Sequence, residues 1–462
     1  MSTALPAALV ADLSSLLGAD GWRTDAPALD ANAQDNSWRR QAPAAVALPA
    51  NVEEVQALVR ACRAHGVALV ARGAGTGTTG AAVPLPGSIV LSFTRMDRIV
   101  EIRAGDRCAV VQPGVLNGTL QQALAPHVLF WAPDPSSAEI CSIGGNLACN
   151  AGGPRAVKYG TSRDNVLRLV AVTGTGTGDV IRCGGAYTKD ATGYDLIHLL
   201  VGSEGTLALI VEATLKLTPL PVSQAVLRVL YRDADAAAAV SRLMSQPVVP
   251  TCLEFMDAHS LQLLRLNGAD VPEAGAMLLV EADGDHDTLP YLLQALASAA
   301  EGDGMLALDV AMEGRARDQL WAARKALSPA LRSFAPGKIN EDVVVPVSRI
   351  PELVAGVQAL AREYTLTIVT FGHAGNGNLH VNILYHPDDA DENARAHAAL
   401  PKIFELTLAL GGTLSGEHGI GLAKRDFMAQ AFTPATLATM RAIKATLDPD
   451  GILNPGKVLP AV

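Results

Sequence analysis

The chain has 462 residues and a net charge of −10, with 49% hydrophobic, 18% charged and 4% aromatic residues. At roughly 150 residues per domain, this length allows two or three domains with substantial cores, and it excludes a small disulfide scaffold or a disordered chain. The acidic balance argues against a nucleic-acid partner, which needs a broad basic surface. The net charge does not exclude an anionic small substrate, provided that a few cationic side chains are concentrated in one pocket.

The six cysteines are scattered, and no two of them form a C-x-x-C pair. This spacing indicates neither a zinc ribbon nor a thiol redox pair, and it favours a reducing compartment. The first residues lack a basic stretch followed by an apolar core, and apolar runs elsewhere are short. We therefore expect no signal peptide, no transmembrane segment and a cytoplasmic protein.

The first elements in chain order form a strand–helix–strand unit. Residues 43–49 resemble a short strand, and Asn51 with Glu54 three positions later is a helix-capping pair. Apolar residues then recur at helical spacing: Val52, Val55, Leu58, Val59 and Cys62. Gly66 stands where a helix ends, and residues 67–70 read as the next strand.

Short apolar strands separated by glycine turns follow between residues 88 and 220. The clearest strand is 207–217, where alternate residues are apolar and predict one buried face. These residues are Leu207, Leu209, Val211, Ala213, Leu215 and Leu217. The segment 174–178 reads as a hairpin turn.

From residue 222 to 372, apolar runs alternate with helical stretches. The runs are Val226–Tyr231, Met277–Glu281 and Met305–Val310, and the helical stretches are 233–245, 288–300 and 315–332. This pattern predicts an α+β domain in which helices cover a mostly antiparallel sheet. The proline-containing segment 218–224 is its natural boundary.

A glycine-rich loop lies at residues 72–80, where Gly75, Gly77 and Gly80 have the G-x-G-x-x-G spacing. A dinucleotide-binding Rossmann turn would need a helix next, but two prolines and a glycine within residues 81–88 forbid one. The loop can still offer several backbone N–H groups to a phosphate, because small residues do not block the approach. The alternative is an ordinary connection between two strands.

Two further stretches are rich in small residues. One covers residues 142–160, with Asn146 and Asn150 among its glycines, and the other covers residues 202–206. Such segments bury little apolar area, so the close approach of a ligand explains them better than core packing.

These stretches, in this order and together with Asp134–Ser137, resemble the FAD-binding domain of the vanillyl-alcohol oxidase and p-cresol methylhydroxylase superfamily. Residues 453–457 resemble the terminal segment that returns to the flavin. The resemblance implies that Gly73 to Gly80 wrap the FAD pyrophosphate. It implies as cofactor-binding residues Arg72, Gly73, Ala74, Gly75, Thr76, Gly77, Thr78, Gly80, Pro135, Ser142, Gly145, Asn146, Asn150, Gly152, Glu204, Gly205 and Asn454.

Two details of this loop qualify the cofactor prediction. No His or Cys stands where some members of the superfamily attach FAD covalently, so we expect non-covalent FAD. Ala74 stands where the family commonly has glycine, and alanine fits only if that residue keeps a negative φ.

Histidines and one glutamate gather in two glycine-framed segments, residues 371–385 and 411–421. His380 and Asn382 share one face of a strand, and glycines 375 and 377 permit a turn that brings His373 beside them. Two imidazoles and a carboxylate suit a divalent metal, with zinc expected ahead of manganese. The alternative is that each histidine is a separately hydrogen-bonded loop residue.

The same segments resemble the metal site of FAD-dependent D-2-hydroxy-acid dehydrogenases. The resemblance implies His373, His380 and Glu417 as metal ligands and His418 as the catalytic base. Asn376 replaces an aspartate that is often found beside these ligands.

The resemblance also implies four substrate contacts, which are Arg324, Ser328, Lys338 and Asn382. Arg324 and Ser328 lie one helical turn apart on one face of the helix predicted over 315–332. Without the resemblance, Arg324 and Lys338 would be ordinary surface charges.

The resemblance covers almost the whole chain and implies an α+β fold class. We expect a two-subdomain FAD-binding domain over residues 1–220 and a cap domain with a mostly antiparallel sheet and the metal site over 221–422. A segment over 423–462 returns to the flavin. The expected reaction oxidises a D-2-hydroxy acid to the 2-oxo acid by hydride transfer to flavin N5, with D-2-hydroxyglutarate slightly preferred over D-lactate. The expected electron acceptor is an electron-transfer flavoprotein or a quinone, and a homodimer stays open.

Three alternatives remain at this point. A metal-free flavin dehydrogenase or oxidase of glycolate or alditol type would use the histidines only for hydrogen bonds. A zinc hydrolase would leave three glycine-rich loops unexplained. A non-catalytic flavin subunit of a larger complex would need the FAD loops alone.

Overall fold

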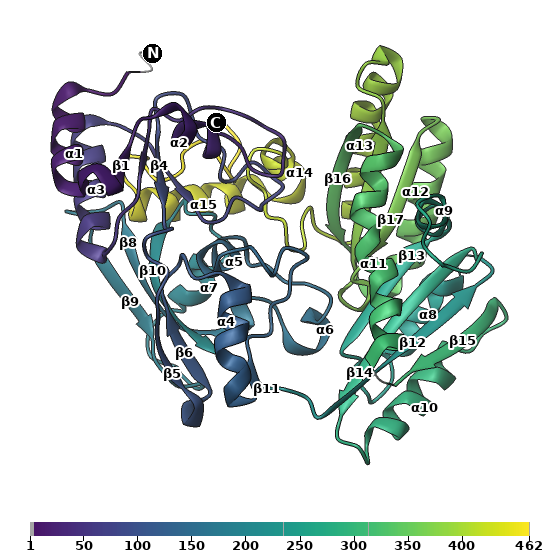
Figure 1. Cartoon of the computed structure of the whole chain (residues 1–462). Coiled ribbons are helices and arrows are strands. Elements are labelled where there is room, and N and C mark those ends of the chain that lie inside the picture. The colour runs from purple at the N-terminus through teal and green to yellow at the C-terminus, as the bar shows by residue number, and fades with distance from the viewer. Residues whose placement is uncertain (1–3, 234, 313, 462) are drawn as a thin grey trace. The chain divides into compact units, whose positions relative to one another are not determined.

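The computed structural model describes residues 4–233, 235–312 and 314–461, and its internal contacts divide the chain into two units (Figure 1). Unit 1 consists of Met1–Gly152, Gly160–Leu220 and Glu417–Val462. Unit 2 consists of Gly153–Tyr159 and Pro221–Gly416. Of the helices in the described ranges, none has both the length and the hydropathy needed to cross a bilayer.

The first sheet of unit 1 has the strand order β1-β2-β4-β3. Its strands are β1 (Trp22–Arg23), β2 (Ala45–Ala47), β3 (Leu69–Arg72) and β4 (Ile89–Ser92). The strands β2 and β3 both run parallel to β4, and helix α3 (Val52–His65) connects them. Asn51 Oδ1 accepts the Glu54 N–H at 2.9 Å, and Gly66 ends the helix in the left-handed conformation. The predicted strand–helix–strand unit is therefore confirmed.

The second sheet of unit 1 is antiparallel throughout and has the order β5-β6-β10-β8-β9. Its strands are β5 (Ile99–Arg103), β6 (Cys108–Val111), β8 (Val166–Thr173), β9 (Val180–Gly184) and β10 (Ala208–Lys216). The turn between β8 and β9 contains residues 174–178, as predicted. The short strands β7 (Leu129–Phe130) and β11 (Thr218–Pro219) form a separate pair.

The alternating apolar residues of β10 do not share a single buried face, contrary to the prediction. Leu209 and Val211 belong to a core shared with α1 and α3, whereas Ala213 and Leu215 belong to a core on the opposite face. The register shifts between Ile210 and Glu212, and such a bulge moves the following side chains to the other side of the sheet. The strand is thus covered on both faces.

Helices and 3-10 turns complete unit 1. They are α1 (Ala7–Gly21), α2 (Ala26–Ala31), α4 (Asn117–Leu124), α5 (Ile143–Cys149), α7 (Leu196–Leu200), α14 (Met428–Ala431), α15 (Pro434–Leu447), η1 (Ala104–Asp106), η2 (Ala125–His127), η3 (Arg163–Asn165) and η6 (Arg425–Phe427). The C-terminal part of the chain enters the first sheet of this unit, because Leu69 N–H donates to Ile452 O and Asn454 N–H donates to Leu69 O, both at 2.8 Å.

Unit 2 is built on a seven-stranded sheet of order β15-β12-β14-β13-β17-β18-β16, in which every neighbouring pair is antiparallel. The strands are β12 (Ser223–Tyr231), β13 (Cys252–Asp257), β14 (Ala276–Gly284), β15 (Met305–Ala311), β16 (Gly337–Val344), β17 (Thr367–Gly372) and β18 (Asn378–Tyr385). This sheet confirms the predicted α+β domain with its antiparallel sheet.

Helices cover both faces of the seven-stranded sheet (Figure 1). On one face lie α9 (Ala258–Leu266) and α11 (Gly314–Phe334), and their apolar residues share a core with Met256, Leu279 and Phe371. The remaining elements of the unit are α6 (Ala156–Tyr159), α8 (Asp235–Met244), α10 (Leu289–Ala300), α12 (Ile350–Glu363), α13 (Ala390–Ala409), η4 (Val347–Arg349) and η5 (Ala374–Asn376). The short helix α6 belongs to this unit although its neighbours in the chain belong to unit 1.

The cap of α3 gives a test of the local stability of unit 1. We expect Asn51→Ala to remove the side-chain acceptor and cost about 1 kcal/mol, which lowers the melting temperature of this unit by roughly 2–4 °C. Asn51→Asp keeps an acceptor at the same position and should melt near the wild-type temperature. Calorimetry of the three proteins checks this, and equal melting temperatures for all three would contradict it.

Candidate functional sites

The glycine-rich loop of unit 1 begins where β3 ends at Arg72, and no helix follows it before β4. This agrees with the exclusion of a Rossmann turn. Gly75 and Gly80 have positive φ angles of 72° and 79°, which favour glycine, whereas Ala74 is not among the non-glycine residues with positive φ. Alanine at position 74 is therefore compatible with the loop.

This loop contacts the second small-residue stretch. A Cβ atom on Gly73 would lie 2.2 Å from Ser142 Oγ, so only glycine fits there. Ser142 caps α5, a helix that the sequence did not predict, by accepting the Gly145 N–H at 3.2 Å. Asn150 ends the same helix, and its side-chain oxygen accepts the Arg163 N–H at 2.9 Å.

The third small-residue loop, residues 202–206, holds part of the C-terminal segment through Glu204. The buried Glu204 carboxylate accepts the N–H groups of Ile420 at 2.6 Å and Gly421 at 2.8 Å. Burial raises the pKa of Glu204 to about 7, although these two hydrogen bonds act to lower it. The carboxylate is thus used to fix the loop that follows Glu417 and His418.

The glycine-rich loop holds the same segment through Thr79. Its carbonyl accepts the N–H groups of Leu422 at 2.8 Å and Ala423 at 3.0 Å, and its hydroxyl donates to His418 O at 3.2 Å. Two of the loops predicted to surround the cofactor therefore also position the segment that carries His418.

Four buried polar atoms around these loops have no hydrogen-bond partner within the described protein: Arg72 Nη1, Thr78 Oγ1, Asn146 Nδ2 and Asn454 Oδ1. Buried polar groups without partners are rare in folded proteins, and such groups point to a ligand that satisfies them. All four residues are predicted cofactor-binding residues. The residues present fit a large polar ligand such as FAD.

The other predicted cofactor residues also lie in unit 1: Ala74, Gly75, Thr76, Gly77, Gly80, Pro135, Gly145, Gly152 and Gly205. Thr76 and Gly77 accept hydrogen bonds from Asn36 through their carbonyl oxygens. A Cβ atom on Gly75 would lie 2.2 Å from Arg72 Nη2, so the loop folds closely over this arginine.

In unit 2, the turn between β17 and β18 brings His373 and His380 together, as the sequence predicts. Their ring centroids lie 5.1 Å apart, and both side chains are buried. Gly377 makes this turn possible, since its φ is 73° and a Cβ atom there would lie 1.9 Å from Val345 O. One ring nitrogen of His373 and one ring nitrogen of His380 lie within 4.8 Å of each other, a separation that suits two ligands of one metal ion.

A buried glutamate that the sequence analysis missed lies behind His373. Glu254 Oε1 accepts from His373 Nδ1 at 2.5 Å, and Oε2 accepts from Arg324 Nε at 2.6 Å. Burial would raise the pKa of this fully buried carboxyl, but the charges of His373 and Arg324 and their hydrogen bonds lower it to about 2. The 2.5 Å contact suits a hydrogen bond that His373 Nδ1 donates to the Glu254 carboxylate.

A second missed acid, Asp342, lies opposite His380 across the β16–β18 pair, with 3.7 Å between Oδ1 and Nδ1. Asp342 is fully buried and accepts from Asn378 Nδ2 at 2.7 Å and from Ser415 Oγ and Gly416 N–H at 2.9 Å. Glu417 and His418 follow Gly416 directly in the chain.

The predicted substrate contacts also lie in unit 2. The Arg324 guanidinium lies over the Phe371 ring at 4.7 Å, and Ser328, four residues later on α11, is exposed. Burial, with a further contribution from Arg332, lowers the pKa of Lys338. Asn382 is buried, and its amide donates to Val369 O at 3.3 Å and to His380 O at 3.2 Å.

A sequence signal for both missed acids exists. Glu254 interrupts the apolar run of β13, and Asp342 directly precedes Val343 and Val344 at the end of β16. An acid next to buried apolar residues of a strand has to find a partner in the folded protein. The side chain of Asn376 is exposed, and the hydrogen bond that the structure gives for the His373 ring is with Glu254 and not with Asn376.

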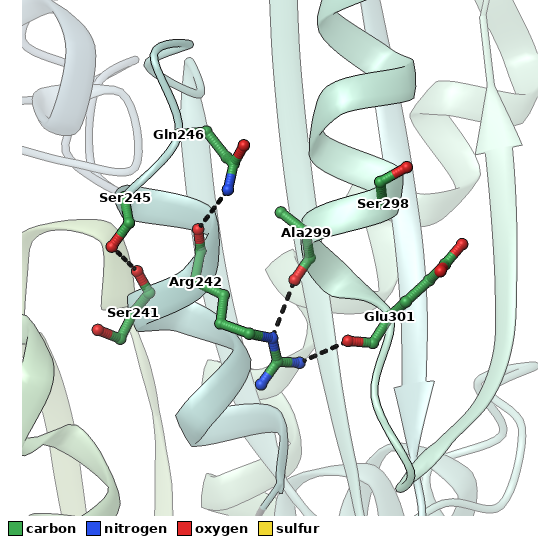
Figure 2. Close-up of a pocket in the computed structure, with 7 residues that line it drawn as sticks. All are labelled: Ser241, Arg242, Ser245, Gln246, Ser298, Ala299 and Glu301. Carbon is green, nitrogen blue, oxygen red and sulfur yellow. Dashed lines mark hydrogen bonds between the residues drawn. The ribbon is translucent and has the colours of Figure 1, made fainter.

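A surface depression of about 320 Å³ between α8 and α10 is a different feature of unit 2 (Figure 2). Arg242, one of its two charged residues, donates to the carbonyl oxygens of Ala299 at 3.1 Å and Glu301 at 3.0 Å. These bonds satisfy carbonyls at the end of α10, so Arg242 stabilises the helix terminus.

Family models match most of the chain. The model described as "FAD binding domain" matches residues 43–184, and the model described as "FAD linked oxidases, C-terminal domain" matches residues 220–458. The chain belongs to the FAD-linked oxidase family. It is an FAD-binding oxidoreductase of the D-2-hydroxy-acid dehydrogenase type within the vanillyl-alcohol oxidase and p-cresol methylhydroxylase superfamily, as the resemblance implied.

Curated relatives of this FAD-linked oxidase extend over nearly its full length. It is 39% identical to glycolate oxidase subunit GlcD of Bacillus subtilis (strain 168), with 90% of this chain and 89% of the relative covered. It is 36% identical to D-2-hydroxyglutarate dehydrogenase of Stutzerimonas stutzeri (strain A1501), with 98% and 99% covered. It is 34% identical to D-lactate dehydrogenase of Anaerostipes hadrus, with 88% of each covered.

Solved structures support the fold of the FAD-linked oxidase. The chain matches p-cresol methylhydroxylase with a TM-score of 0.83 at 18% identity, covering 98% of this chain and 96% of the other. It matches 4-ethylphenol oxidase from Gulosibacter chungangensis with a TM-score of 0.79 at 18% identity, covering 98% and 97%. At these identities the likeness concerns the fold alone.

The contact between Gly73 and Ser142 gives a test of the FAD site. We expect Gly73→Ala to displace the loop or the start of α5, because the added methyl group overlaps Ser142 Oγ. The purified variant should then lose most of its flavin absorbance near 450 nm. Gly105→Ala is the control, since nothing lies within 4 Å of a Cβ atom there. A Gly73→Ala protein that keeps its full flavin content would show that the loop tolerates the methyl group.

Proposed function

We propose that this FAD-linked oxidase oxidises a D-2-hydroxy acid to the 2-oxo acid with the help of a divalent metal ion. The observation that carries the proposal is the pair of buried imidazoles, His373 and His380: Nδ1 of His373 lies 2.5 Å from the buried Glu254 carboxylate, and Nδ1 of His380 lies 3.7 Å from the buried Asp342 carboxylate. A carboxylate behind a histidine is the usual support of a metal-binding imidazole. Separately hydrogen-bonded loop histidines would not need this arrangement.

We further propose His373, His380 and Glu417 as the metal ligands, with zinc ahead of manganese. Glu417 is one peptide bond beyond Gly416, whose N–H donates to Asp342, the residue behind His380. Chain connectivity therefore supports its assignment as the third ligand. Two imidazoles and one carboxylate leave coordination positions for substrate oxygens, and such a metal would make the substrate hydroxyl more acidic.

The cofactor would be held without a covalent bond by the loops of unit 1. Arg72, Thr78, Asn146 and Asn454 offer the unpartnered buried atoms, and the small residues from Gly73 to Gly80 leave the backbone open to a pyrophosphate. When bound, FAD accepts the hydride at N5, and the residues of this chain bind and orient the substrate.

His418 is the proposed general base, which removes the proton of the substrate hydroxyl. Its segment is fixed by Thr79 and Glu204, so the imidazole is carried on a loop with little freedom. A positioned base contributes about 10²–10⁴-fold to such a step. Arg324, Ser328, Lys338 and Asn382 are the proposed substrate contacts.

The charges in unit 2 support a dicarboxylate as the preferred substrate. The Arg324 charge is balanced in part by Glu254, whereas Lys338 Nζ makes no hydrogen bond or ion pair with any described residue. A partly buried cation without a partner suits an additional carboxylate of the substrate. We therefore place D-2-hydroxyglutarate slightly ahead of D-lactate, and the relative with that name aligns over 99% of its length.

Glycolate oxidation is the second candidate function. The relative named glycolate oxidase subunit GlcD is 39% identical to this chain. Because that name describes a subunit, the experiment below also tests whether this chain is a flavin-carrying subunit of a larger complex. An electron-transfer flavoprotein or a quinone is the proposed electron acceptor for either substrate.

Anaerobic spectra of the purified protein test the proposed function. We expect the flavin band near 450 nm to bleach with D-2-hydroxyglutarate, more slowly with D-lactate, and not with the L-enantiomers. Prior chelation should abolish bleaching, and added zinc or manganese should restore it. Bleaching by glycolate alone, or bleaching that chelation leaves intact, would favour the glycolate-type alternative. A yellow protein that no hydroxy acid bleaches would favour the non-catalytic subunit.

Replacement of the proposed base gives a second test. His418→Asn should slow flavin reduction by about 10²–10⁴-fold, because the proposed base is then missing. Flavin content should stay at the wild-type level, since the cofactor contacts are unchanged. Stopped-flow reduction measures the rate, and a variant that reduces its flavin at the wild-type rate would remove His418 from this role.

A further inference from the structure

We propose that Glu254 is a positioning residue that links anion binding at Arg324 to metal binding at His373. This inference rests on the proposed function, because it takes His373 as a metal ligand and Arg324 as a substrate contact. Glu254 lies in β13, has no exposed surface, and places one carboxylate oxygen on each partner.

The bond to His373 selects one form of the imidazole. Glu254 Oε1 lies 2.5 Å from His373 Nδ1, and when Nδ1 donates this hydrogen bond, the lone pair of a neutral imidazole is on Nε2. The bond also holds the ring at a fixed orientation, 5.1 Å from the ring of His380 and nearly perpendicular to it. Glu254 therefore prepares Nε2 of His373 to bind a metal ion.

The bond to Arg324 orients the guanidinium in the same way. Glu254 accepts from Nε, and the Phe371 ring lies 4.7 Å from the guanidinium carbon on another side. Within the described ranges, neither Nη1 nor Nη2 of Arg324 forms a hydrogen bond. The two Nη groups are thus held ready for a bidentate contact with a carboxylate.

One carboxylate serves both partners, so a change at one affects the other. The two oxygens belong to a single rigid group on a buried strand, and a movement of Glu254 toward either partner lengthens its bond to the other. A metal ion on His373 and a substrate carboxylate on Arg324 would both favour the geometry that Glu254 already holds. Their binding free energies are coupled in this way.

The neighbouring strand β14 offers a matched control. Glu281 is also buried, and it accepts from Trp321 Nε1 at 2.9 Å and from Arg155 Nε at 3.2 Å. Like Glu254, it connects the sheet to α11 and faces an arginine. None of the side-chain hydrogen bonds and ion pairs that the structure gives for Glu281 involves a proposed metal ligand or substrate contact, so we expect its replacement to affect stability alone.

The test is Glu254→Gln in the full-length protein. An amide has one acceptor oxygen, so it satisfies Arg324 or His373, and its NH₂ group faces the other donor. If the NH₂ group faces His373, the imidazole has to move its proton to Nε2, which blocks the metal. We expect zinc affinity, measured by competition with a chromophoric chelator, to fall about 10–100-fold. We expect the KM for D-2-hydroxyglutarate to rise by roughly tenfold or more.

Two further variants separate positioning from folding. Glu281→Gln should keep wild-type zinc affinity and KM, with at most a lower melting temperature. Glu254→Asp keeps the charge but is one methylene shorter, so it should recover part of the zinc affinity that Glu254→Gln loses. Flavin content and melting temperature of each variant report whether it folds.

The outcomes distinguish this inference from the proposed function. Wild-type affinity and KM in a folded Glu254→Gln protein would overturn the inference and leave the proposed function intact. Equal losses in Glu254→Gln and Glu281→Gln would also overturn it, because the effect would then come from the sheet in general. A wild-type protein that binds no divalent metal would overturn the metal part of the proposed function and this inference together.

Discussion

A buried carboxyl group is costly unless polar partners satisfy it, and the candidate site of unit 2 is organised around two such groups, Glu254 and Asp342. Glu254 is balanced by an imidazole and a guanidinium, and Asp342 by an amide, a hydroxyl and a backbone N–H. Breaking such a buried arrangement leaves an uncompensated charge, which is strongly destabilising. Glu254 therefore connects β13 to α11 and to His373, and Asp342 connects β16 to β18, the strand that carries His380. These connections hold the two histidines in place.

Unit 1 is governed by a different constraint, which is close approach of backbone segments. Gly73 lies against Ser142, and Gly421 lies so near Thr79 that a Cβ atom would be 2.4 Å from its carbonyl oxygen. These contacts leave no space for a side chain at either glycine, so the backbone is exposed to the predicted cofactor site at these positions beside the polar side chains of Arg72 and Asn146. The same segments hold the loop of His418, which ties the shape of the FAD site to the position of the proposed base.

Several features of the fold and of the candidate site were predictable from the sequence, because the residues that determine them are close together in the chain. The cap of α3, the proline-containing exit of the glycine-rich loop and the turn between His373 and His380 depend on residues within ten positions of each other. Glu254 was not predictable in its role, since its partners lie 70 and 119 residues away and no periodicity connects them. The bulge in β10 was missed because alternation of apolar residues continues across it, while the cores on both faces are apolar.

The division of the chain has a consequence for how the protein is made. Ile452 and Leu453 belong to the same core as Leu69 and α3, and Leu69 pairs directly with Leu453. The ribosome synthesises these two residues only after the whole of unit 2. The first sheet of the FAD-binding unit therefore remains incomplete beside Leu69 until unit 2 has been synthesised. Unit 2 is synthesised completely before the last segment of unit 1, Glu417–Val462. We therefore expect unit 2 to fold first, although the chain begins with unit 1.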